Sequence, residues 1–583
     1  MPDQDEIIAR LGKPLVDRID PKTFRLGIVL NGTVAAGAWT AGVLDALVEA
    51  LDAWELAKAA DRKAGTRTVP DHNVRLDVLG GASGGGVCAA LLARAASRNF
   101  PAVQDRNGNA ANPFWDVWVE KLDIDAMLGV DDLAKADAPA ASLLSGKAID
   151  LAGDAILQWG INTPGVTLRA TPRPWLADPF HVLVTLTNLR GVPYGIAFEA
   201  SGGGAPRASW YVNHADHALF AFASANAQTA AGIRPDEWVV DRDFTAASGT
   251  WAEFAEYTKA TGAFPVGFPP RRLSRPTEHY AWRAVALPGG QINGVPQPAK
   301  ISLLSPAWGA LPPADQPGAT YVFDCVDGGA CNNEPVELVR VALAGLGNTL
   351  EREGSKADAA VLVIDPFAAA PDCPAPGAPP SMFGVGLGLT GAWKDEARFA
   401  TSDLLLALDT NVCSRFLLTA GRTNAKGDKV WGGNAVSGSG LGAFLGFLDR
   451  GYRVHDFLLG RKNCRDWLRS YFVLDENNPV FNDFGKQPAA KDFRPAGKAQ
   501  LPIIPLVPAV QGALTQPDWP VLHPATFGLR GDIEHRLRAV ADRVGEQSKV
   551  PCNDLLALLL AAWGATYARQ TIATAADQQN GLA

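Results

Sequence analysis

The sequence predicts an α/β fold with three layers and a mostly parallel central sheet, followed by a largely α-helical C-terminal region. Near its start the chain has two successive units of strand, glycine-bearing loop and helix, at residues 24–51 and 74–96. This order is typical of a parallel sheet. Apolar runs at 181–189, 320–326 and 359–364 indicate further buried strands.

The elements follow in order along the chain. We expect a strand at 24–30 (FRLGIVL) and a helix of small and aliphatic residues at 38–51. A second strand at 74–79 (VRLDVL) then leads through the turn 80–86 (GGASGGG) into a helix at 87–96. Residues 101–180 and 201–319 read as insertions, and such loop-rich segments often cover a substrate.

A Pro/Gly-rich segment after residue 367 indicates a boundary near residue 375. We therefore predict an N-terminal segment 1–23, an α/β domain 24–368 and a mostly helical region 375–583. Helical periodicity is expected at 402–419, 441–472 and 532–574, with a loop-like stretch at 475–524.

Composition narrows the class of protein. The 583 residues include 53 basic and 61 acidic side chains, and the net charge of −8 disfavours nucleic acid as a main partner. Seven scattered cysteines without a C-x-x-C pair indicate neither a disulfide framework nor a zinc site. The acidic start and the short apolar runs predict a cytoplasmic chain with no Sec signal peptide or transmembrane helix. Peripheral membrane contact is compatible with this composition, and the oligomeric state is left open.

The first chemical motif is Gly81-Ala82-Ser83-Gly84-Gly85, the G-x-S-x-G of this chain. A strand that turns sharply into a helix exposes the serine hydroxyl, and glycines at 81 and 85 avoid clashes there. The alternative is a glycine-rich turn that only tightens strand against helix.

The second motif, Asp327-Gly328-Gly329, ends a predicted strand and precedes Asn333 and Pro335. Its glycines let the loop pass close to another backbone, so the carboxylate projects from the strand end. A purely structural turn is the alternative.

The third motif is the loop 31–37 (NGTVAAG), which joins the first strand to the first helix. Backbone N–H groups at the start of a helix can stabilise a developing negative charge. The same loop could simply begin the helix.

A serine nucleophile needs a base. None of the eight histidines occupies a recognisable α/β-hydrolase position, so Asp327 is the better candidate for a base that acts directly. His455 reads as a packing residue. His214 and His217 lack a third metal ligand at a sensible spacing, and we expect a surface loop there.

Together these motifs resemble the patatin-like phospholipase family of acyl hydrolases over residues 24–368. The segments 37–44, 141–146, 260–265 and 268–270 are also similar to family segments, and 451–461 resembles a stretch of some bacterial members. The resemblance implies a Ser-Asp dyad, with Ser83 as nucleophile and Asp327 as general base. It also implies an oxyanion hole at Gly32, Thr33 and Val34, with no metal or other cofactor.

The oxyanion loop departs from the family pattern. The usual G-G-G-x-R/K-G is here Gly32-Thr33-Val34-Ala35-Ala36-Gly37, which lacks two glycines and the basic residue. Because β-branched Thr33 and Val34 resist positive φ, we expect a hole of different shape.

The leading functional hypothesis is a serine acyl hydrolase of phospholipase A, lipase or esterase type, acting on a lipid or another carboxylic ester through an acyl-enzyme. A catalytically weak lipid-binding or scaffold protein of the same fold is the main alternative. Nucleotide binding is less favoured, because the glycine loop fails G-x-G-x-x-G at its middle position.

Overall fold

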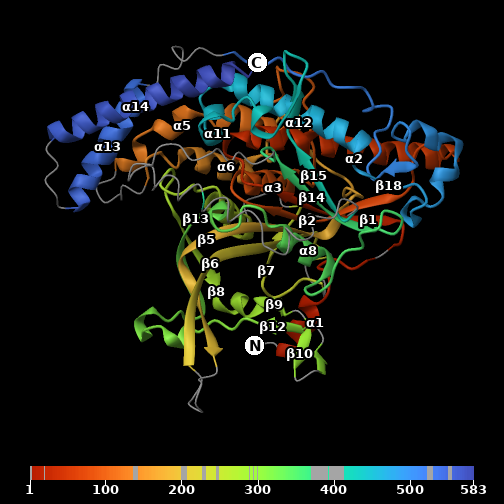
Figure 1. The fold of residues 1–583 in the computed structure, drawn as a ribbon, viewed down its shortest axis with the longest axis horizontal. Helices are drawn as coiled ribbons and strands as arrows, with labels where there is room; N and C mark the ends of the chain where they lie inside the picture. The colour runs from red at the N-terminus through yellow and green to blue at the C-terminus, as the bar shows by residue number, and fades with distance from the viewer. Residues whose placement is uncertain are drawn as a thin grey trace.

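The computed structural model describes residues 3–18, 20–134, 142–198, 207–225, 227, 232–243, 249–287, 289–292, 295–297, 300–368, 392, 413–521, 530–548 and 554–582. Its centre is a nine-stranded sheet in the order β15-β14-β1-β2-β5-β13-β8, extended by β6 beside β5 and β7 beside β6. Helices lie on both sides of this sheet (Figure 1). The predicted α/β class is therefore confirmed.

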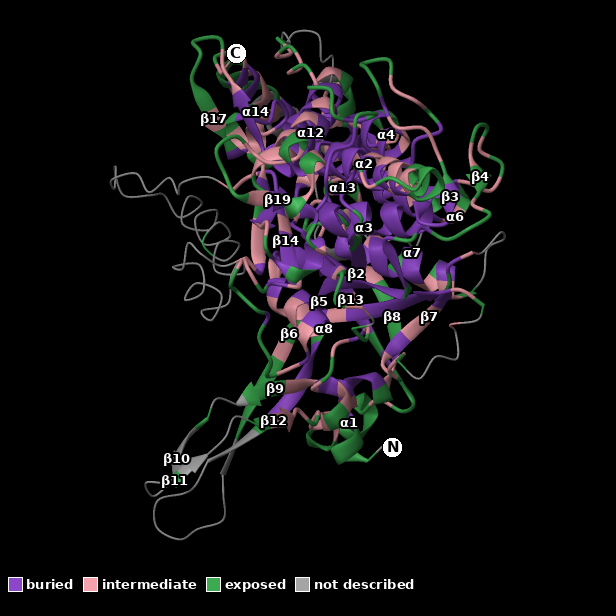
Figure 2. Ribbon diagram, turned by 90° about the vertical axis from the view of Figure 1, so that its right-hand side faces the viewer, coloured by how far each residue is buried: buried purple, intermediate pink, exposed green. Residues whose placement is uncertain are grey.

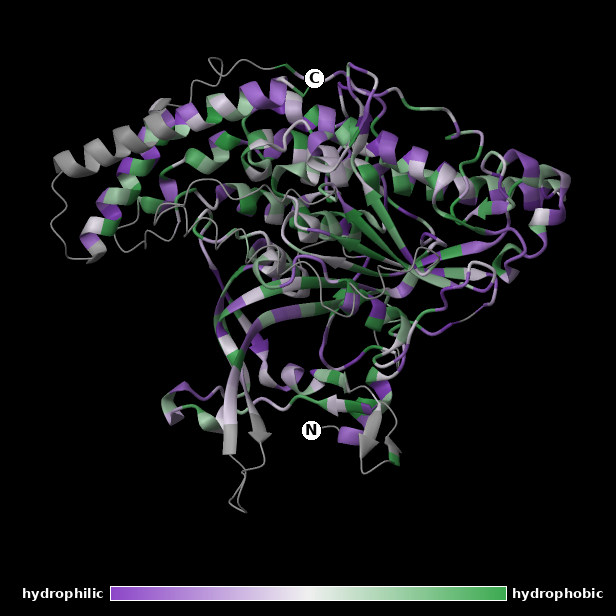
Figure 3. Ribbon diagram, viewed as in Figure 1, coloured by the Kyte–Doolittle hydropathy of each residue, from purple (hydrophilic) through white to green (hydrophobic). Residues whose placement is uncertain are grey.

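The parallel part of the sheet comes from the predicted strand–loop–helix units. β1 (Thr23–Leu30) pairs in parallel with β2 (Asn73–Gly81) on one side and with β14 (Ala359–Asp365) on the other. β2 also pairs in parallel with β5 (Leu176–Phe198). Helices cover both faces of this part of the sheet, so its strands are buried (Figure 2). Their residues are accordingly mostly hydrophobic (Figure 3).

The other strands of the sheet depart from the parallel pattern or extend it at an edge. β13 (Thr320–Asp327) runs antiparallel between β5 and β8 (Arg271–Pro276), and β6 (Arg207–Ala223) runs antiparallel to β5. β7 (Glu237–Asp241) closes that edge, parallel to β6. The long β5–β6 hairpin projects away from the body of the molecule (Figure 1).

Two helical layers enclose the sheet. α2 (Gly37–Ala64), α3 (Gly84–Ala95) and α7 (Gly249–Thr261) lie on one side, and α8 (Val336–Ala344) packs against β1, β2 and β14 on the other. α4 (Pro113–Trp115), the π-helical turn η2 (Asp116–Lys121), α5 (Ile124–Leu128) and α6 (Lys147–Gln158) extend the first layer. The predicted insertion 101–180 thus contributes short helices to this layer.

The remaining described elements are peripheral. α1 (Gln4–Leu11), β9 (Ala284–Leu287), β10 (Gly290–Ile292), β11 (Val295–Gln297) and β12 (Lys300–Leu303) gather near the N-terminus (Figure 1). Short two-stranded pairs are formed by β3 (Arg98–Asn99) with β4 (Thr167–Leu168), β16 (Gly421–Thr423) with β17 (Lys429–Trp431), and β18 (Val473–Asp475) with β19 (Gln500–Pro502).

The described part of the C-terminal region includes α11 (Gly440–Ala443), α12 (Arg450–Ser470), α13 (Arg530–Ser548) and α14 (Asp554–Asn580). The expected helix at 402–419 is wrong where it can be compared. Residues 415–419 form β15 (Arg415–Thr419), which pairs in parallel with β14 at the edge of the central sheet. Residues 402–412, and the boundary expected near 375, lie outside the described residues.

Glycines and ion pairs hold α12 against α2. A Cβ atom on Gly42 would lie 1.9 Å from the carbonyl oxygen of Phe457, so the two backbones touch at this crossing. Arg461 on α12 forms buried ion pairs with Asp45 and Glu49 of α2. The C-terminal region is therefore packed on the first helix of the α/β layer by both shape and charge.

His72 marks a second junction with the C-terminal region. Its ring is fully buried between Trp54 and Phe481, and its Nε2 lies 2.8 Å from the carbonyl oxygen of Ile503. Burial penalises the charged ring and lowers the pKa of His72 to about 3. The imidazole is therefore neutral in the folded protein at neutral pH.

One described helical segment, Val34–Ala64, is long and apolar enough to span a membrane, but 89% of its most apolar window is buried within the fold. Trp39 and Trp54 on this segment are completely covered. Such burial is typical of a core helix.

Candidate active site

Ser83 lies at the sharp turn between β2 and α3. Its backbone has φ 53° and ψ −129°, a strained conformation for a residue other than glycine. The Ser83 N–H donates a hydrogen bond to Oγ1 of Thr261, the last residue of α7, over 3.0 Å. The side chain is half-buried at the N-terminus of α3.

The glycines around Ser83 are required by close approaches. A Cβ atom on Gly85 would lie 2.1 Å from the carbonyl oxygen of Leu30, and one on Gly81 would lie 2.7 Å from the backbone of Gly86. Larger residues at either position would push strand and helix apart. The turn therefore holds its serine in the geometry of a nucleophile elbow.

Asp327 ends β13 and is almost fully buried, with 3% of its surface exposed. Its carboxylate accepts a 2.7 Å hydrogen bond from the N–H of Gly329, and its carbonyl oxygen accepts one from Thr187 Oγ1. A Cβ atom on Gly328 would lie 2.1 Å from the carbonyl oxygen of Thr185 on β5. Both glycines of the turn thus serve to fix the carboxylate at the strand end.

Gly32 brings the three predicted motifs together. A Cβ atom placed on Gly32 would lie 3.2 Å from Cβ of Ser83 and 2.2 Å from Oδ1 of Asn333. One placed on Gly329 would lie 2.6 Å from the same Asn333 oxygen and 3.1 Å from Oδ1 of Asp327. A continuous chain of close approaches therefore joins the serine turn, the glycine loop and the aspartate turn.

The glycine loop is strained at one of its two β-branched residues. Thr33 keeps a negative φ of −130°, but β-branched Val34 is held at φ 49° as it begins the 3₁₀ turn η1 (Val34–Ala36). The backbone N–H groups of Gly32 and Thr33 have no hydrogen-bond acceptor within the described ranges.

An apolar cavity of about 70 Å³ opens beside Ser83. Trp118 comes from η2, Phe264 and Phe268 follow α7, and Phe447 comes from the C-terminal region. Two predicted insertions and the C-terminal region thus build its walls. Sequence reasoning indicated neither Phe447 nor the hydrogen bond of Thr261, because both depend on contacts between distant parts of the chain.

No histidine among the described residues lines the cavity beside Ser83. His455 is buried and its Nδ1 lies 2.8 Å from Asp456, in keeping with a packing role. The expected surface loop at 214–217 is wrong: these residues lie within β6, with His214 bonded to the carbonyl oxygen of Asn188. His523 lies outside the described residues.

The chain is similar to a family of known proteins over much of its length. A sequence model of the patatin-like phospholipase family matches residues 28–340, more than half of the chain. The chain belongs to the patatin-like phospholipase family. Membership of this family indicates a lipid acyl hydrolase, with lipids as the class of substrate.

A relative extends the similarity through the C-terminal region. An uncharacterized protein of Sinorhizobium fredii, y4iI, is 30% identical over 585 aligned positions, which cover 91% of this chain and 78% of the relative. The patatin-like chain and this relative therefore share more than the hydrolase domain.

Proposed function

We propose that this patatin-like protein hydrolyses the carboxylic ester of a lipid through a Ser83–Asp327 dyad. The observation that carries the proposal is the meeting of the serine turn, the aspartate turn and the glycine loop at Gly32, beside an apolar cavity. A nucleophile, a carboxylate and backbone donors are the groups that acyl transfer requires.

In the first half of the reaction, Ser83 attacks the acyl carbonyl while Asp327 takes the hydroxyl proton. The N–H groups of Gly32, Thr33 and Val34 stabilise the oxyanion, and the leaving alcohol accepts the proton. In the second half, Asp327 draws a proton from water, which attacks the acyl-enzyme and releases the carboxylic acid. Ser83 then recovers its proton.

The experiment is labelling with a fluorophosphonate probe, together with ester turnover. Ser83→Ala should abolish both, and Asp327→Asn should reduce turnover at least a hundredfold, as expected for a general base. The half-buried residues Ser355 and Asp324 provide matched controls, since Ser355→Ala and Asp324→Asn make the same changes outside the cavity beside Ser83. Turnover retained by Ser83→Ala would refute the nucleophile.

A specific observation favours the alternative, a catalytically weak lipid-binding protein. Val34 occupies a positive φ where the family usually has glycine, and the basic residue of the loop is replaced by Ala36. Lipid binding without fluorophosphonate labelling would support this alternative.

We further propose that an apolar rim around the cavity contacts a lipid surface. Leu143, Phe264 and Val266 are 46%, 55% and 71% exposed, and Phe264 also lines the cavity. The N–H of Leu143 donates to the carbonyl of Val266 over 2.9 Å, which joins the two loops into one surface. Arg536 of α13 holds the rim by donating to the carbonyl oxygen of Leu143. Exposed apolar side chains continuous with a lipid cavity are typical of interfacial binding.

Co-sedimentation with phosphatidylcholine vesicles tests the rim. Val266→Asp and Phe264→Asp should each lower binding at least fivefold, because a charge must be desolvated at the interface. Leu56→Asp is the matched control, since Leu56 is 73% exposed on α2. Equal loss in the control would assign binding to general surface hydrophobicity and refute the rim.

A further inference from the structure

A second and larger cavity, of about 580 Å³, lies on the α8 side of the sheet. Its aliphatic lining includes Leu183 of β5, Leu219 of β6 and Val341 of α8. Neither Ser83 nor any residue of α3 lines it. This cavity is therefore separate from the candidate active site.

The cavity is long as well as large. Its lining along β6 runs from Asn213 to Leu219, and six steps of an extended strand span roughly 20 Å. Close-packed protein interiors contain few voids of this size. A cavity of about 150 Å³ already holds benzene, and known sites for small molecules measure roughly 300–1,000 Å³. The dimensions therefore suit one extended hydrocarbon chain with a small head group.

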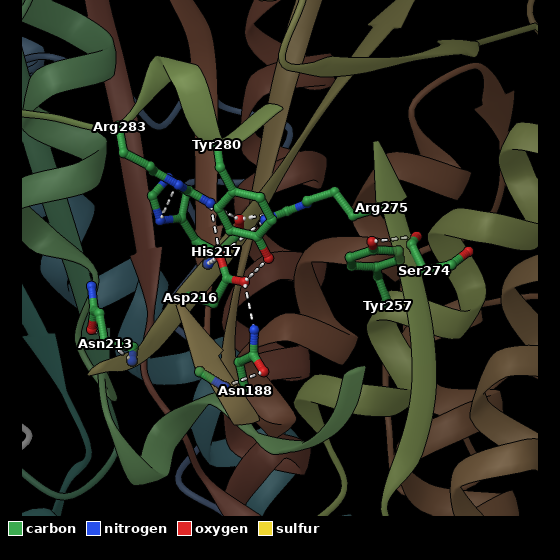
Figure 4. Close-up of polar contacts among 11 residues, drawn as sticks. Asn188, Asn213, Asp216, His217, Tyr257, Ser274, Arg275, Tyr280 and Arg283 are labelled. Carbon is green, nitrogen blue, oxygen red and sulfur yellow. Dashed lines mark hydrogen bonds and ion pairs between the residues drawn. The ribbon is translucent and has the colours of Figure 1, made fainter. Parts of the chain in front are cut away.

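The charged groups on the cavity wall are paired within the protein, beginning with a buried cluster around Asp216 (Figure 4). Its carboxylate accepts hydrogen bonds from Arg275 over 2.9 Å and from Arg283 over 2.7 Å. Although burial acts to raise it, these two guanidinium groups hold the pKa of Asp216 well below its usual range. Burial and the neighbouring Arg283 lower the pKa of His217 well below its ordinary value, so this imidazole is neutral at neutral pH.

The remaining charges of the wall are balanced as well. Arg234 binds both oxygens of Asp236, at 3.0 and 2.9 Å, and lies 3.6 Å from Glu237, which does not line the cavity. Glu337 binds Arg340. The described charged residues of the lining and their ion-pair partners therefore comprise four carboxylates (Asp216, Asp236, Glu237 and Glu337) and four guanidinium groups (Arg234, Arg275, Arg283 and Arg340). An ionic head group would bring an uncompensated charge into this wall, which costs free energy.

Three uncharged polar groups of the wall keep unused hydrogen-bonding capacity. The hydroxyl of Tyr194 and the side-chain amide of Asn332 form no hydrogen bond with any residue that the structure describes. Oδ1 of Asn213 accepts from the N–H of Ala215 over 3.0 Å, but its Nδ2 has no acceptor within the same described ranges. Burial raises the pKa of Tyr194 to about 12, so its hydroxyl keeps its proton at neutral pH. Such groups donate to and accept from an uncharged hydroxyl.

Tyr194 and Asn213 lie together at one end of the cavity. In the antiparallel β5–β6 register, Tyr194 is paired with Tyr211, two residues before Asn213 on the same strand. Because opposed residues point to the same face of a sheet, Tyr194 and Asn213 are diagonal neighbours on that face. Leu183 and Leu219 are paired with each other farther along the two strands. The lining therefore has one end with unused polar groups and, roughly 20 Å away, an aliphatic end.

We propose that this cavity binds an uncharged single-chain amphiphile whose head group carries a hydroxyl. The head lies at Tyr194 and Asn213, and the hydrocarbon chain runs along β6 toward Leu219 and Val341. Anionic and cationic heads are disfavoured alike, because the charges of the wall already balance. A long-chain alcohol and a monoacylglycerol share this chemistry. The inference goes beyond the proposed ester hydrolysis and does not depend on Ser83 as a nucleophile.

Isothermal titration calorimetry tests the head group, using the full chain with Ser83→Ala so that no ester is turned over by the proposed dyad. Dodecanol, laurate and dodecylammonium supply one chain length with a neutral, an anionic and a cationic head. We expect dodecanol to bind at least tenfold more tightly than either ion. 1-Monolauroylglycerol supplies a second neutral head. Tighter binding of this ester than of dodecanol assigns the site to a monoacylglycerol, and weaker or equal binding assigns it to a simple alcohol.

A hydroxyl deletion tests where the head group lies. Tyr194→Phe removes an oxygen that has no partner among the described residues, so the fold should be kept. Dodecanol affinity should nevertheless fall about fivefold, as expected for the loss of one hydrogen bond. Tyr471→Phe is the matched control, because Tyr471 is 63% exposed and does not line the cavity.

Two further variants separate the two cavities. Val341→Trp places an indole in the large cavity and should abolish dodecanol binding, whereas Ala152→Trp obstructs the cavity beside Ser83 and should leave it intact. The reverse pattern would overturn the assignment. It would also be overturned by an ion that binds as tightly as dodecanol, by the absence of dodecanol binding, or by unchanged dodecanol affinity in Tyr194→Phe. The ligand series and Tyr194→Phe leave the cavity open, so they decide the question even if the tryptophan variants fail to fold.

Discussion

We predict that Phe447, which lines the cavity beside Ser83, limits the acyl length of the ester that this protein accepts. The cavity of about 70 Å³ is small, since one of about 150 Å³ holds benzene. It therefore accommodates only a few carbons of an acyl chain, and we expect short esters to be turned over fastest. Phe447 is 6% exposed, so truncation to alanine converts the volume of its ring into cavity.

The magnitude follows from the burial of methylene groups. Each buried CH₂ contributes about 0.8 kcal/mol, which is about fourfold in kcat/KM at 25 °C. If the Phe447→Ala cavity admits two further methylenes, we compare two esters whose acyl chains differ by two methylenes. In the variant, kcat/KM for the longer ester should rise about 16-fold relative to kcat/KM for the shorter ester. The variant should lose about 3–5 kcal/mol of stability, so its melting temperature is measured alongside.

The assay is kcat/KM for a series of p-nitrophenyl esters from acetate to decanoate. Phe444→Ala is the matched control, because the Phe444 ring lies 5.3 Å from that of Phe447 without lining the cavity. A chain-length profile that is the same in Phe447→Ala and in the unsubstituted protein would refute the assignment of this cavity to the acyl group.

Three other predictions concern the supports of the fold and the site. Thr261→Val leaves the Ser83 N–H without its acceptor, so turnover should fall at least tenfold and Thr261→Ser should restore it. Arg461→Met leaves the buried carboxylate of Asp45 without its ion-pair partner, although Glu49 keeps Arg465, and should cost about 3–5 kcal/mol in chemical denaturation. Arg450→Met, at an exposed pair, should cost less than about 1 kcal/mol. The pKa of His72 is about 3 in the folded protein and about 6.5 in the unfolded chain, so between these pH values only the unfolded chain binds a proton at this residue. The free energy of unfolding should therefore fall by about 2 kcal/mol from pH 7 to pH 5. His72→Gln should remove this part of the pH dependence of stability.

Local signals in the sequence predicted the elements that position the candidate dyad. The two strand–loop–helix units appear as β1 with α2 and β2 with α3, because apolar runs and glycine turns act within a few residues. β15 was missed because an edge strand of five residues carries little periodic signal, and tertiary pairing with β14 decides its state.

Long-range contacts account for what the sequence could not predict. His214 and His217 were expected in a surface loop, yet both lie within β6, where the carbonyl oxygen of Asn188 bonds His214 and Arg283 contacts His217. Phe447 reaches the cavity beside Ser83 from a segment more than 350 residues away. No periodicity encodes such partners, because they depend on how distant elements pack.

The C-terminal region offers a physical reason for the unusual glycine loop. Ala36, where the family usually has a basic residue, is completely buried, and a Cβ atom on Gly446 would lie 2.8 Å from Cβ of Ala35. α11 and α12 pack against η1, so an arginine or lysine at position 36 would need space that the C-terminal region fills, and its charge would lose its hydration. In this chain the C-terminal region therefore packs where a basic side chain at position 36 would extend, next to the candidate oxyanion site.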